Sequence, residues 1–129
     1  MIDTSIWVDY FNKKNCSQYI FIDSLIDTNK VITLPVIMQE ILQGISDDAV
    51  YNLIMKTLLD FKIPRIDYIH AAIQAASLFR NLRKKGISIR KPNDCLIAAI
   101  CLENNFAILH NDKDFDNIAK HTSLKIYKP

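Results

Sequence analysis

Hydrophobic residues along the chain fall into two patterns: short unbroken runs, and longer stretches with helical spacing. The runs at Val31–Leu34 and Phe106–Leu109 are brief and apolar, as is typical of β-strands that are buried on both faces. The predicted strands cover Val31–Leu34, Lys62–Ile66, Phe106–Leu109 and Leu124–Tyr127, and Met1–Ile2 is predicted to end a further one. Pro64 lacks the backbone N–H that a sheet ladder needs, so the run that contains it is predicted to lie at an edge.

Helical patterns separate these runs. Pro35 begins one helix and Gly44 ends it, which is the expected order for these two residue types. Asp47 and Asp48 begin a second helix, and Asp67 begins a third. The predicted helices cover 6–11, 35–44, 47–61, 67–86, 92–105 and 112–120. Strands that alternate with helices predict an α/β fold, with a central parallel sheet of about five short strands flanked by helices on both faces.

Length and composition limit the number of domains and the kinds of partner that the protein can have. Its 129 residues predict a single domain over 1–129. The 16 basic and 14 acidic residues give a net charge of +2, so a nucleic-acid partner would be met by a local patch and not by the overall charge. Only two glycines are present, which excludes the glycine-rich phosphate-binding loops.

The cysteines and the apolar runs indicate where the protein works. Cys16, Cys95 and Cys101 have no CxxC spacing, and we expect them to be small core residues in a reducing compartment. No apolar run approaches the length of about 18 residues that a membrane span needs. No signal peptide is visible either. These features predict a cytoplasmic protein with no membrane partner.

The acidic residues stand in unusual places. Asp3 follows the first predicted strand, and Asp112 and Asp114 closely follow the strand that ends at Leu109. Asp94 begins an otherwise apolar helix, and Glu40 stands inside the apolar stretch VIMQEIL. Each has an ordinary interpretation, because aspartate caps helices and favours their N-terminal dipole by about 0.3–1 kcal/mol, and a helical glutamate can face water. Thr4 and Ser5, which follow Asp3, are also N-cap types and could cap the first helix in its place.

Taken together, the acidic residues indicate a metal site more strongly than any one of them does alone. In an open α/β sheet the strand ends converge on one edge, where these carboxylates would meet. Such a cluster repels itself and raises its own pKa values, and a divalent cation relieves that repulsion. Oxygen ligands favour Mg²⁺ or Mn²⁺ over Zn²⁺. An ion of this kind can generate hydroxide from water and stabilise the charge that develops during attack on a phosphodiester.

Four segments resemble one known family in order and spacing: IDTSIWVDYF, VIMQEILQG, RKPNDCLIAAICLENN and LHNDKDFDNIAK. They are similar to the PIN-domain ribonucleases, and in particular to the VapC toxins of bacterial toxin–antitoxin pairs. The resemblance spans nearly the whole chain, although the first strand is shorter than is common in the family. It implies a PIN-domain fold and Mg²⁺- or Mn²⁺-dependent cleavage of RNA. It also implies structured RNA such as tRNA as substrate, a homodimer, and a VapB-like antitoxin whose helix lies in a groove between early helices.

On that resemblance the family's four acids correspond to Asp3, Glu40, Asp94 and Asp112, with Asp114 as the fifth carboxylate that some members add. We expect Asp3 and Asp94 to bind the principal metal, and Asp112 and Asp114 to complete the pocket. Glu40 would orient or deprotonate the attacking water, or ligate through water. Behind them we expect supporting hydrogen bonds from Thr4, Ser5 and Asn93.

The basic residues cluster in FRNLRKKGISIRKP, which holds six of the 16. One interpretation is a solvated helix end, where cations suit the dipole. The other is a patch that binds RNA phosphates, made by Arg83, Lys84, Lys85, Arg90 and Lys91. Arg90 and Lys91 precede Asp94 so closely that we expect them at the rim of the pocket.

Other function classes stay open at this point. A phosphoacceptor signalling domain also combines acids with Mg²⁺, but it needs a single aspartate after the third strand and a lysine after the fifth, and the fit is poor. A non-catalytic RNA- or protein-binding module of the same fold is a second alternative. A housekeeping RNA-processing nuclease of the PIN type differs from a toxin in biology and not in chemistry.

Overall fold

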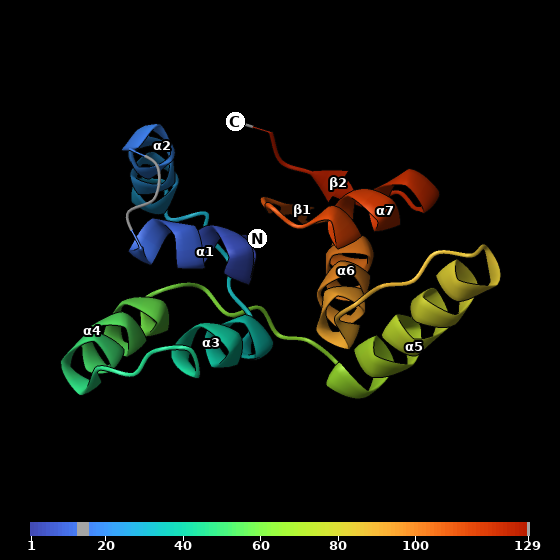
Figure 1. The fold of residues 1–129 in the computed structure, drawn as a ribbon, viewed down its shortest axis with the longest axis horizontal. Helices are drawn as coiled ribbons and strands as arrows, with labels where there is room; N and C mark the ends of the chain where they lie inside the picture. The colour runs from blue at the N-terminus through green and yellow to red at the C-terminus, as the bar shows by residue number, and fades with distance from the viewer. Residues whose placement is uncertain (13–15, 129) are drawn as a thin grey trace. The chain divides into compact units, whose positions relative to one another are not determined.

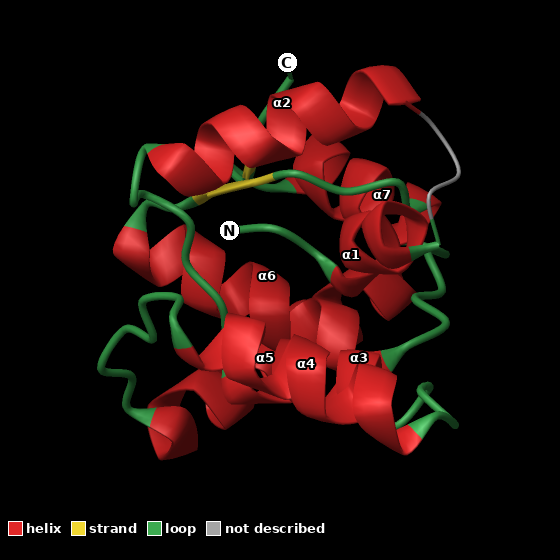
Figure 2. Cartoon of the chain, turned by 90° about the vertical axis from the view of Figure 1, so that its left-hand side faces the viewer, coloured by secondary structure: helices red, strands yellow, loops and turns green. Residues whose placement is uncertain are grey.

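Helices make up most of the computed structural model of this chain, which describes residues 1–12 and 16–128 (Figure 1). The strands are short, as the secondary-structure colouring in Figure 2 shows. The described chain divides into two compact units, Met1–Pro64 and Arg65–Lys128. The expectation of a single domain over 1–129, based on chain length, stays a prediction.

The first unit is built from four helices in the described residues: α1 (Thr4–Phe11), α2 (Cys16–Asp27), α3 (Pro35–Leu42) and α4 (Asp48–Leu59). α1 packs against α2 and α3, and α3 packs against α4. Trp7 of α1 is fully buried, with its ring centroid 5.2 Å from that of Phe61 and 5.7 Å from that of Phe11. Burying an aromatic side chain of this size is a large part of the stability of so small a core.

The described residues of the first unit include a parallel bridge between Ile32 and Lys62. The Thr33 N–H donates to the Lys62 carbonyl over 3.1 Å at the same place. Pro64 follows two residues later, and its missing N–H ends the pairing on that side. The two apolar runs predicted as strands are therefore neighbours, and they pair over a shorter length than the runs themselves.

The second unit contains α5 (Tyr68–Lys84), α6 (Pro92–Asn104), β1 (Ala107–Ile108), α7 (Lys113–His121) and β2 (Lys125–Ile126). α6 packs against α5 and α7, and α7 also contacts β2. The two strands are parallel, with Ala107 opposite Lys125 and Ile108 opposite Ile126. α6 lies in the core of this unit, where seven of its residues are buried.

Helix boundaries follow the capping signals. Asp47 accepts a hydrogen bond from the Val50 N–H, and Asp67 accepts one from the His70 N–H, so the helix starts predicted at these residues are confirmed. The expectation that Thr4 or Ser5 caps the first helix is wrong. Asp3 is the N-cap of α1, because its backbone is extended and its carboxylate accepts from the Ser5 N–H.

α2 carries no strong capping signal and was not predicted. Cys95 and Cys101 are buried, as expected of core residues, whereas the side chain of Cys16 lies outside the described residues. Among the residues that the structure describes, no helix has the length and apolar character needed to cross a membrane.

Candidate active site

Three of the predicted acids gather in the second unit. One carboxylate oxygen from each of Asp94, Asp112 and Asp114 lies within 4.8 Å of the others. Asp94 is in the first turn of α6, and Asp112 and Asp114 begin α7 as its N-cap and first-turn residues. Asp94 and Asp114 are buried, with 2% and 3% of their surface exposed. Two helix N-termini that pack together therefore bring these carboxylates to one place.

The turn before α7 positions Asp112. Its carboxylate caps the helix by accepting from the Asp114 N–H over 3.0 Å. Its own N–H donates to Nδ1 of His110 over 3.2 Å. The His110 ring is buried and lies 5.2 Å from the ring of Phe115, which is fully buried. His110 thus acts as a structural hydrogen-bond acceptor that fixes the backbone at Asp112.

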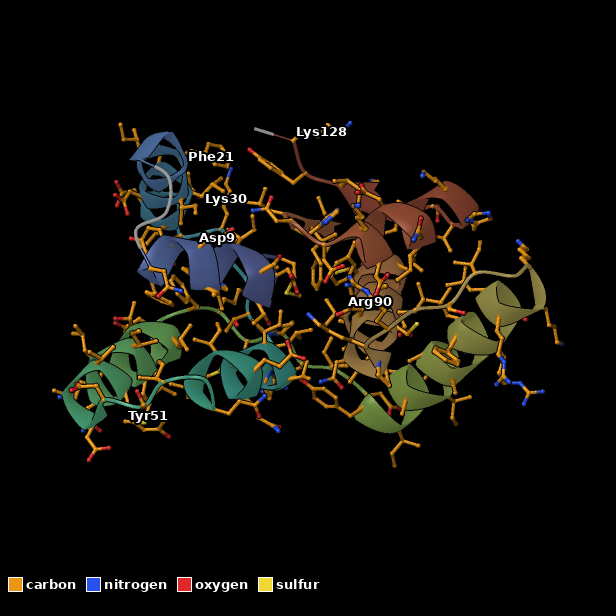
Figure 3. The ribbon with its side chains drawn as sticks, in the orientation of Figure 1. Asp9, Phe21, Lys30, Tyr51, Arg90 and Lys128 are labelled. Atoms are coloured by element: carbon orange, nitrogen blue, oxygen red, sulfur yellow. The ribbon has the colours of Figure 1, made fainter. Side chains whose placement is uncertain are left out.

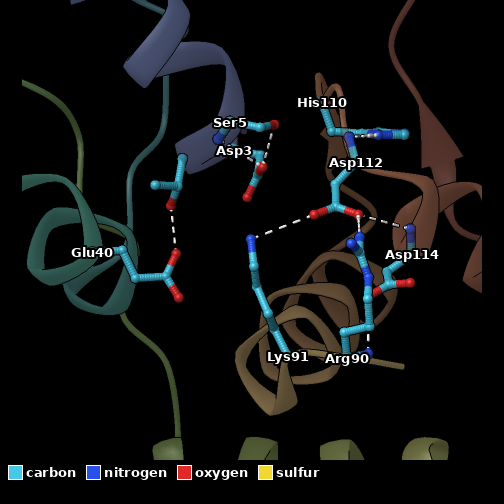
Figure 4. A network of polar contacts seen from close by, with 9 residues as sticks. Asp3, Ser5, Glu40, Arg90, Lys91, His110, Asp112 and Asp114 are labelled. Atoms are coloured by element: carbon cyan, nitrogen blue, oxygen red, sulfur yellow. Dashed lines mark hydrogen bonds and ion pairs between the residues drawn. The ribbon is translucent and has the colours of Figure 1, made fainter. Parts of the chain in front are cut away.

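Two cations contact this carboxylate cluster (Figure 4). Arg90 donates from Nη2 to Asp112 over 2.6 Å, and from Nε to Asp114 over 3.3 Å. Its backbone N–H also donates to Asp114, over 3.0 Å. Lys91 Nζ lies 3.4 Å from the second oxygen of Asp112. Arg90, labelled beside α6 in Figure 3, and Lys91 are well exposed along their side chains.

These contacts set the charge state of the cluster. Burial by itself raises the pKa of the Asp112 carboxyl. The hydrogen bond from the Asp114 backbone and the charges on Arg90 and Lys91 outweigh that effect, so the pKa of Asp112 lies below its ordinary value. The Asp112 carboxylate is therefore ionised at neutral pH.

Asp3 and Ser5 form a separate hydrogen-bonded pair in the first unit. Oδ2 of Asp3 accepts from the Ser5 backbone over 2.9 Å and from the Ser5 hydroxyl over 2.6 Å (Figure 4). Only 4% of the Asp3 surface is exposed. The structure thus shows the hydrogen bond expected from Ser5 to Asp3, and it shows that the same carboxylate holds the N-terminus of α1.

The Glu40 carboxylate accepts a hydrogen bond from Thr4. The Thr4 hydroxyl donates to Oε2 of Glu40 over 2.6 Å, which joins α1 to α3. From the sequence, the Thr4 hydroxyl is expected to support Asp3 or a metal-bound water, and its pairing with Glu40 was not predicted. Helical spacing places Glu40 near the packed face of α3, but the partner of its carboxylate comes from a residue 36 positions earlier.

The remaining predicted residues lie at the start or the end of helices. Asn93 is half-buried in the first turn of α6. Arg83 and Lys84 are in the last turn of α5, Lys85 is its C-cap, and all three are exposed. Arg90 and Lys91 were predicted at the rim of the acidic pocket, and the structure places them in direct contact with its carboxylates.

The donor set fits a hard divalent cation. All three ligands are carboxylate oxygens, and no histidine or cysteine belongs to the described cluster. The three carboxylate oxygens lie within 4.8 Å of one another, so Asp94, Asp112 and Asp114 are the residues that would hold such an ion.

Comparisons with known proteins give matches over nearly the whole chain. A family model described as PIN domain matches residues 1–121. The chain is 32% identical over 127 residues to VapC ribonuclease Mb1587 of Mycobacterium bovis and to Ribonuclease VapC11 of Mycobacterium tuberculosis. Each match covers 97% of this chain and 95% of the relative.

Two solved structures share the fold. The first is the crystal structure of VapBC2 from Rickettsia felis bound to a DNA fragment from the promoter, with a TM-score of 0.75 and 23% identity over 98% of this chain and 96% of that one. The second is VapBC-1 from nontypeable Haemophilus influenzae, with a TM-score of 0.75 and 17% identity over 99% and 96%.

Proposed function

The chain belongs to the PIN-domain family, and from that premise we propose that it is a metal-dependent endoribonuclease, the toxin of a toxin–antitoxin module. The observation that carries the proposal is the carboxylate cluster of Asp94, Asp112 and Asp114. The names of its relatives, VapC ribonuclease Mb1587 and Ribonuclease VapC11, support the activity. The VapBC names of its structural neighbours support the toxin role.

The proposed cofactor is Mg²⁺ or Mn²⁺, held by Asp94, Asp112 and Asp114 in the second unit. A divalent ion supplies the positive charge that activates water for attack on a phosphodiester and that stabilises the negative charge developing on the phosphate. The residues of the chain hold that charge in place. The depressed pKa of Asp112 supports this role, because the carboxylate stays ionised well below neutral pH.

We propose that Asp3 and Glu40 complete the active site, as the family pattern implies. Asp3 would contribute a ligand, directly or through water, and Glu40 would orient or deprotonate the attacking water. Their local contacts are compatible with these roles, since hydroxyl groups that donate to a carboxylate fix its rotamer. Asn93 is proposed to support the site from the first turn of α6.

The proposed substrate is RNA, with tRNA or another structured RNA as the expected class. The exposed cations Arg83, Lys84 and Lys85 at the end of α5 are proposed to bind its phosphates, together with Arg90 and Lys91. Phosphate binding by such residues weakens with salt, so the affinity for RNA should fall steeply between 50 and 200 mM salt.

A VapB-like antitoxin and a second copy of the chain are the proposed protein partners, in the cytoplasm. The first unit offers a groove of about 540 Å³ between the end of α1 and α4, with Tyr10, Phe11, Val50 and Leu53 in its lining. Val50 and Leu53 are exposed apolar residues on α4. An apolar groove of this kind suits the apolar face of an amphipathic helix.

The central test is RNA cleavage with Mg²⁺ or Mn²⁺ and with EDTA. We expect the wild-type protein to cleave structured RNA only with the metal, and Asp94→Asn to reduce cleavage by at least about 100-fold, since it removes a ligand charge. Asp116→Asn is the matched control, because Asp116 lies on α7 beside the cluster but is exposed and outside it. Equal cleavage by Asp94→Asn and the wild type would rule out the proposed site.

Growth separates a toxin from a housekeeping nuclease. Induced expression of the wild-type protein should arrest bacterial growth, and expression of Asp94→Asn should not. Co-expression of a small DNA-binding protein encoded beside the gene should restore growth. A protein that cleaves RNA without arresting growth would be a processing nuclease, and one that binds RNA without cleaving it would be a binding module.

A further inference from the structure

The dipeptide that leads into α6 lies directly on the proposed metal ligands. Arg90 contacts Asp112 and Asp114 at once, and Lys91 contacts Asp112. We expected these two cations to bind RNA phosphates, but in the structure both contact carboxylates. A cation within hydrogen-bond distance of a metal ligand can act in two opposite ways. It can orient the ligand for the ion, or it can compete with the ion for the ligand.

The hydrogen bonds show which oxygens Arg90 occupies. Oδ1 of Asp112 accepts from Arg90 Nη2 and from the Asp114 backbone. Oδ2 of Asp114 accepts from Arg90 twice, through Nε and through the backbone N–H. A carboxylate oxygen has two lone-pair positions, so both of these oxygens are fully engaged. The rotamers of both carboxylates are thereby fixed, and one oxygen of each is left over for a metal: Oδ2 of Asp112 and Oδ1 of Asp114.

Lys91 differs from Arg90 in geometry and in the oxygen that it contacts. Its ammonium lies 3.4 Å from Oδ2 of Asp112, which is the oxygen that Arg90 leaves over. The contact is long, and 58% of the Lys91 side chain is exposed. An ammonium is a compact point charge on a flexible stem, whereas a guanidinium spanning two carboxylates is a rigid fork. An ion bound at Oδ2 would have to displace it.

We propose that the two neighbouring cations act in opposite directions on divalent-ion binding: Arg90 is a positioning residue that turns Asp112 and Asp114 toward the ion, and Lys91 competes with the ion for Asp112. The inference rests on the proposed function, because it takes the cluster to be a metal site. Displacement would release the Lys91 ammonium close to the site, where it can meet a phosphate of the RNA.

Metal binding tests the inference without an activity assay. The probe is Mn²⁺ alone, measured by the loss of the EPR signal of the free ion on titration with purified protein. Lys91→Gln removes the competing charge, and we expect the Kd for Mn²⁺ to fall about 3- to 10-fold. Arg90→Lys keeps the charge but cannot span both carboxylates, and we expect the Kd to rise about 10-fold.

Two variants at the end of α5 serve as matched controls. Lys84→Gln and Arg83→Lys make the same chemical changes at exposed positions on a different helix. We expect either to change the Kd less than 2-fold. Urea unfolding in EDTA identifies any variant that is not folded, and Arg90→Gln then replaces Arg90→Lys, with binding weaker than that of Lys91→Gln as the expected result.

The outcomes separate the inference from the proposed function. Unchanged or weaker Mn²⁺ binding by Lys91→Gln overturns the competing role of Lys91. Unchanged or tighter binding by Arg90→Lys overturns the positioning role of Arg90. In both cases metal-dependent cleavage by the wild-type protein would leave the proposed function standing. A wild-type protein that neither binds millimolar Mn²⁺ nor cleaves RNA would overturn both.

Discussion

The Cys95 thiol lies beside Asp94 in α6 and is only 1% exposed. Burial, followed by the negative charges on Asp94 and Asp114, raises its pKa from 9.0 to about 11. In the unfolded chain the thiol ionises near pH 9, whereas in the folded protein it stays protonated up to about pH 11. The unfolded state therefore binds fewer protons over this interval, and stability falls as the pH rises through it.

The prediction concerns how steeply the free energy of unfolding falls with pH in the wild type and in a variant without the thiol. Between pH 8.5 and pH 10.5 the free energy of unfolding of the wild type should fall more steeply than that of Cys95→Ala, which has no thiol to ionise. Urea unfolding at several pH values measures both slopes, and other groups cancel in the comparison. Parallel curves would mean that the Cys95 pKa is the same in the folded and unfolded chains.

His110 gives a second prediction at a single residue. Its Nδ1 is the acceptor for the Asp112 N–H, and an asparagine at this position can supply an acceptor to the same N–H through an Asx turn. His110→Ala and His110→Asn both remove the ring, so the packing on Phe115 is lost in each. We expect His110→Asn to be more stable than His110→Ala by about 1 kcal/mol, measured by urea unfolding in EDTA. Equal stabilities would show that the hydrogen bond contributes nothing to the turn.

At the scale of the helix, two proposed metal ligands are also N-caps. Asp3 caps α1 and Asp112 caps α7. A change to alanine removes the cap as well as the charge, which costs about 0.5–2 kcal/mol, whereas asparagine caps about as well as aspartate. We therefore expect Asp3→Ala to lower the free energy of unfolding by about 1 kcal/mol more than Asp3→Asn does. We expect both to lose RNA cleavage.

Urea unfolding and cleavage assays on the same samples check this prediction. If Asp3→Asn cleaves RNA as well as the wild type while Asp3→Ala does not, the contribution of Asp3 is capping alone. If the two variants unfold at the same urea concentration, the hydrogen bond from Ser5 does not stabilise α1.

The helices were predictable where local chemistry determines them. Pro35, Asp47 and Asp67 mark helix starts because fixed φ angles and capping carboxylates act within one turn of chain. α2 has no such signal: its Ile20–Ile22 run favours strands as much as helices, and in the structure Ile22 is buried while Ile20 is 75% exposed. The strands were predicted as longer than they are, since pairing depends on a partner elsewhere in the chain.

The site was predictable as a list of acids and not as a set of contacts. The family resemblance selected Asp94, Asp112 and Asp114, and the structure brings these three together. The pairing of Arg90 with two carboxylates depends on how the segment before α6 packs against α7, at a separation of 24 residues. A local sequence pattern does not predict packing between segments so far apart. The predicted PIN-domain fold is confirmed by the family match over residues 1–121.

At the scale of the whole molecule, exposed apolar residues on α5 favour an interface with another protein chain. Ile69 and Ile73 are 79% and 62% exposed, and they lie one turn apart on the same face of α5. A soluble monomer seldom keeps such a pair in water, and the proposed homodimer would cover it. In a two-fold symmetric dimer each residue is used twice, and burial of each isoleucine is worth about 1.5–3 kcal/mol.

The last prediction concerns the oligomeric state. We expect sedimentation velocity to show a dimer for the wild type at micromolar concentrations, and Ile73→Glu to raise the dissociation constant at least about 100-fold, since two burials of about 1.5 kcal/mol are lost. Leu53→Glu on α4, where 66% of the side chain is exposed, is the control and should leave the dimer intact. A monomeric wild type would mean that α5 faces a different partner. Dissociation by Leu53→Glu and not by Ile73→Glu would move the dimer interface to α4, and the groove between α1 and α4 would then be closed to an antitoxin helix.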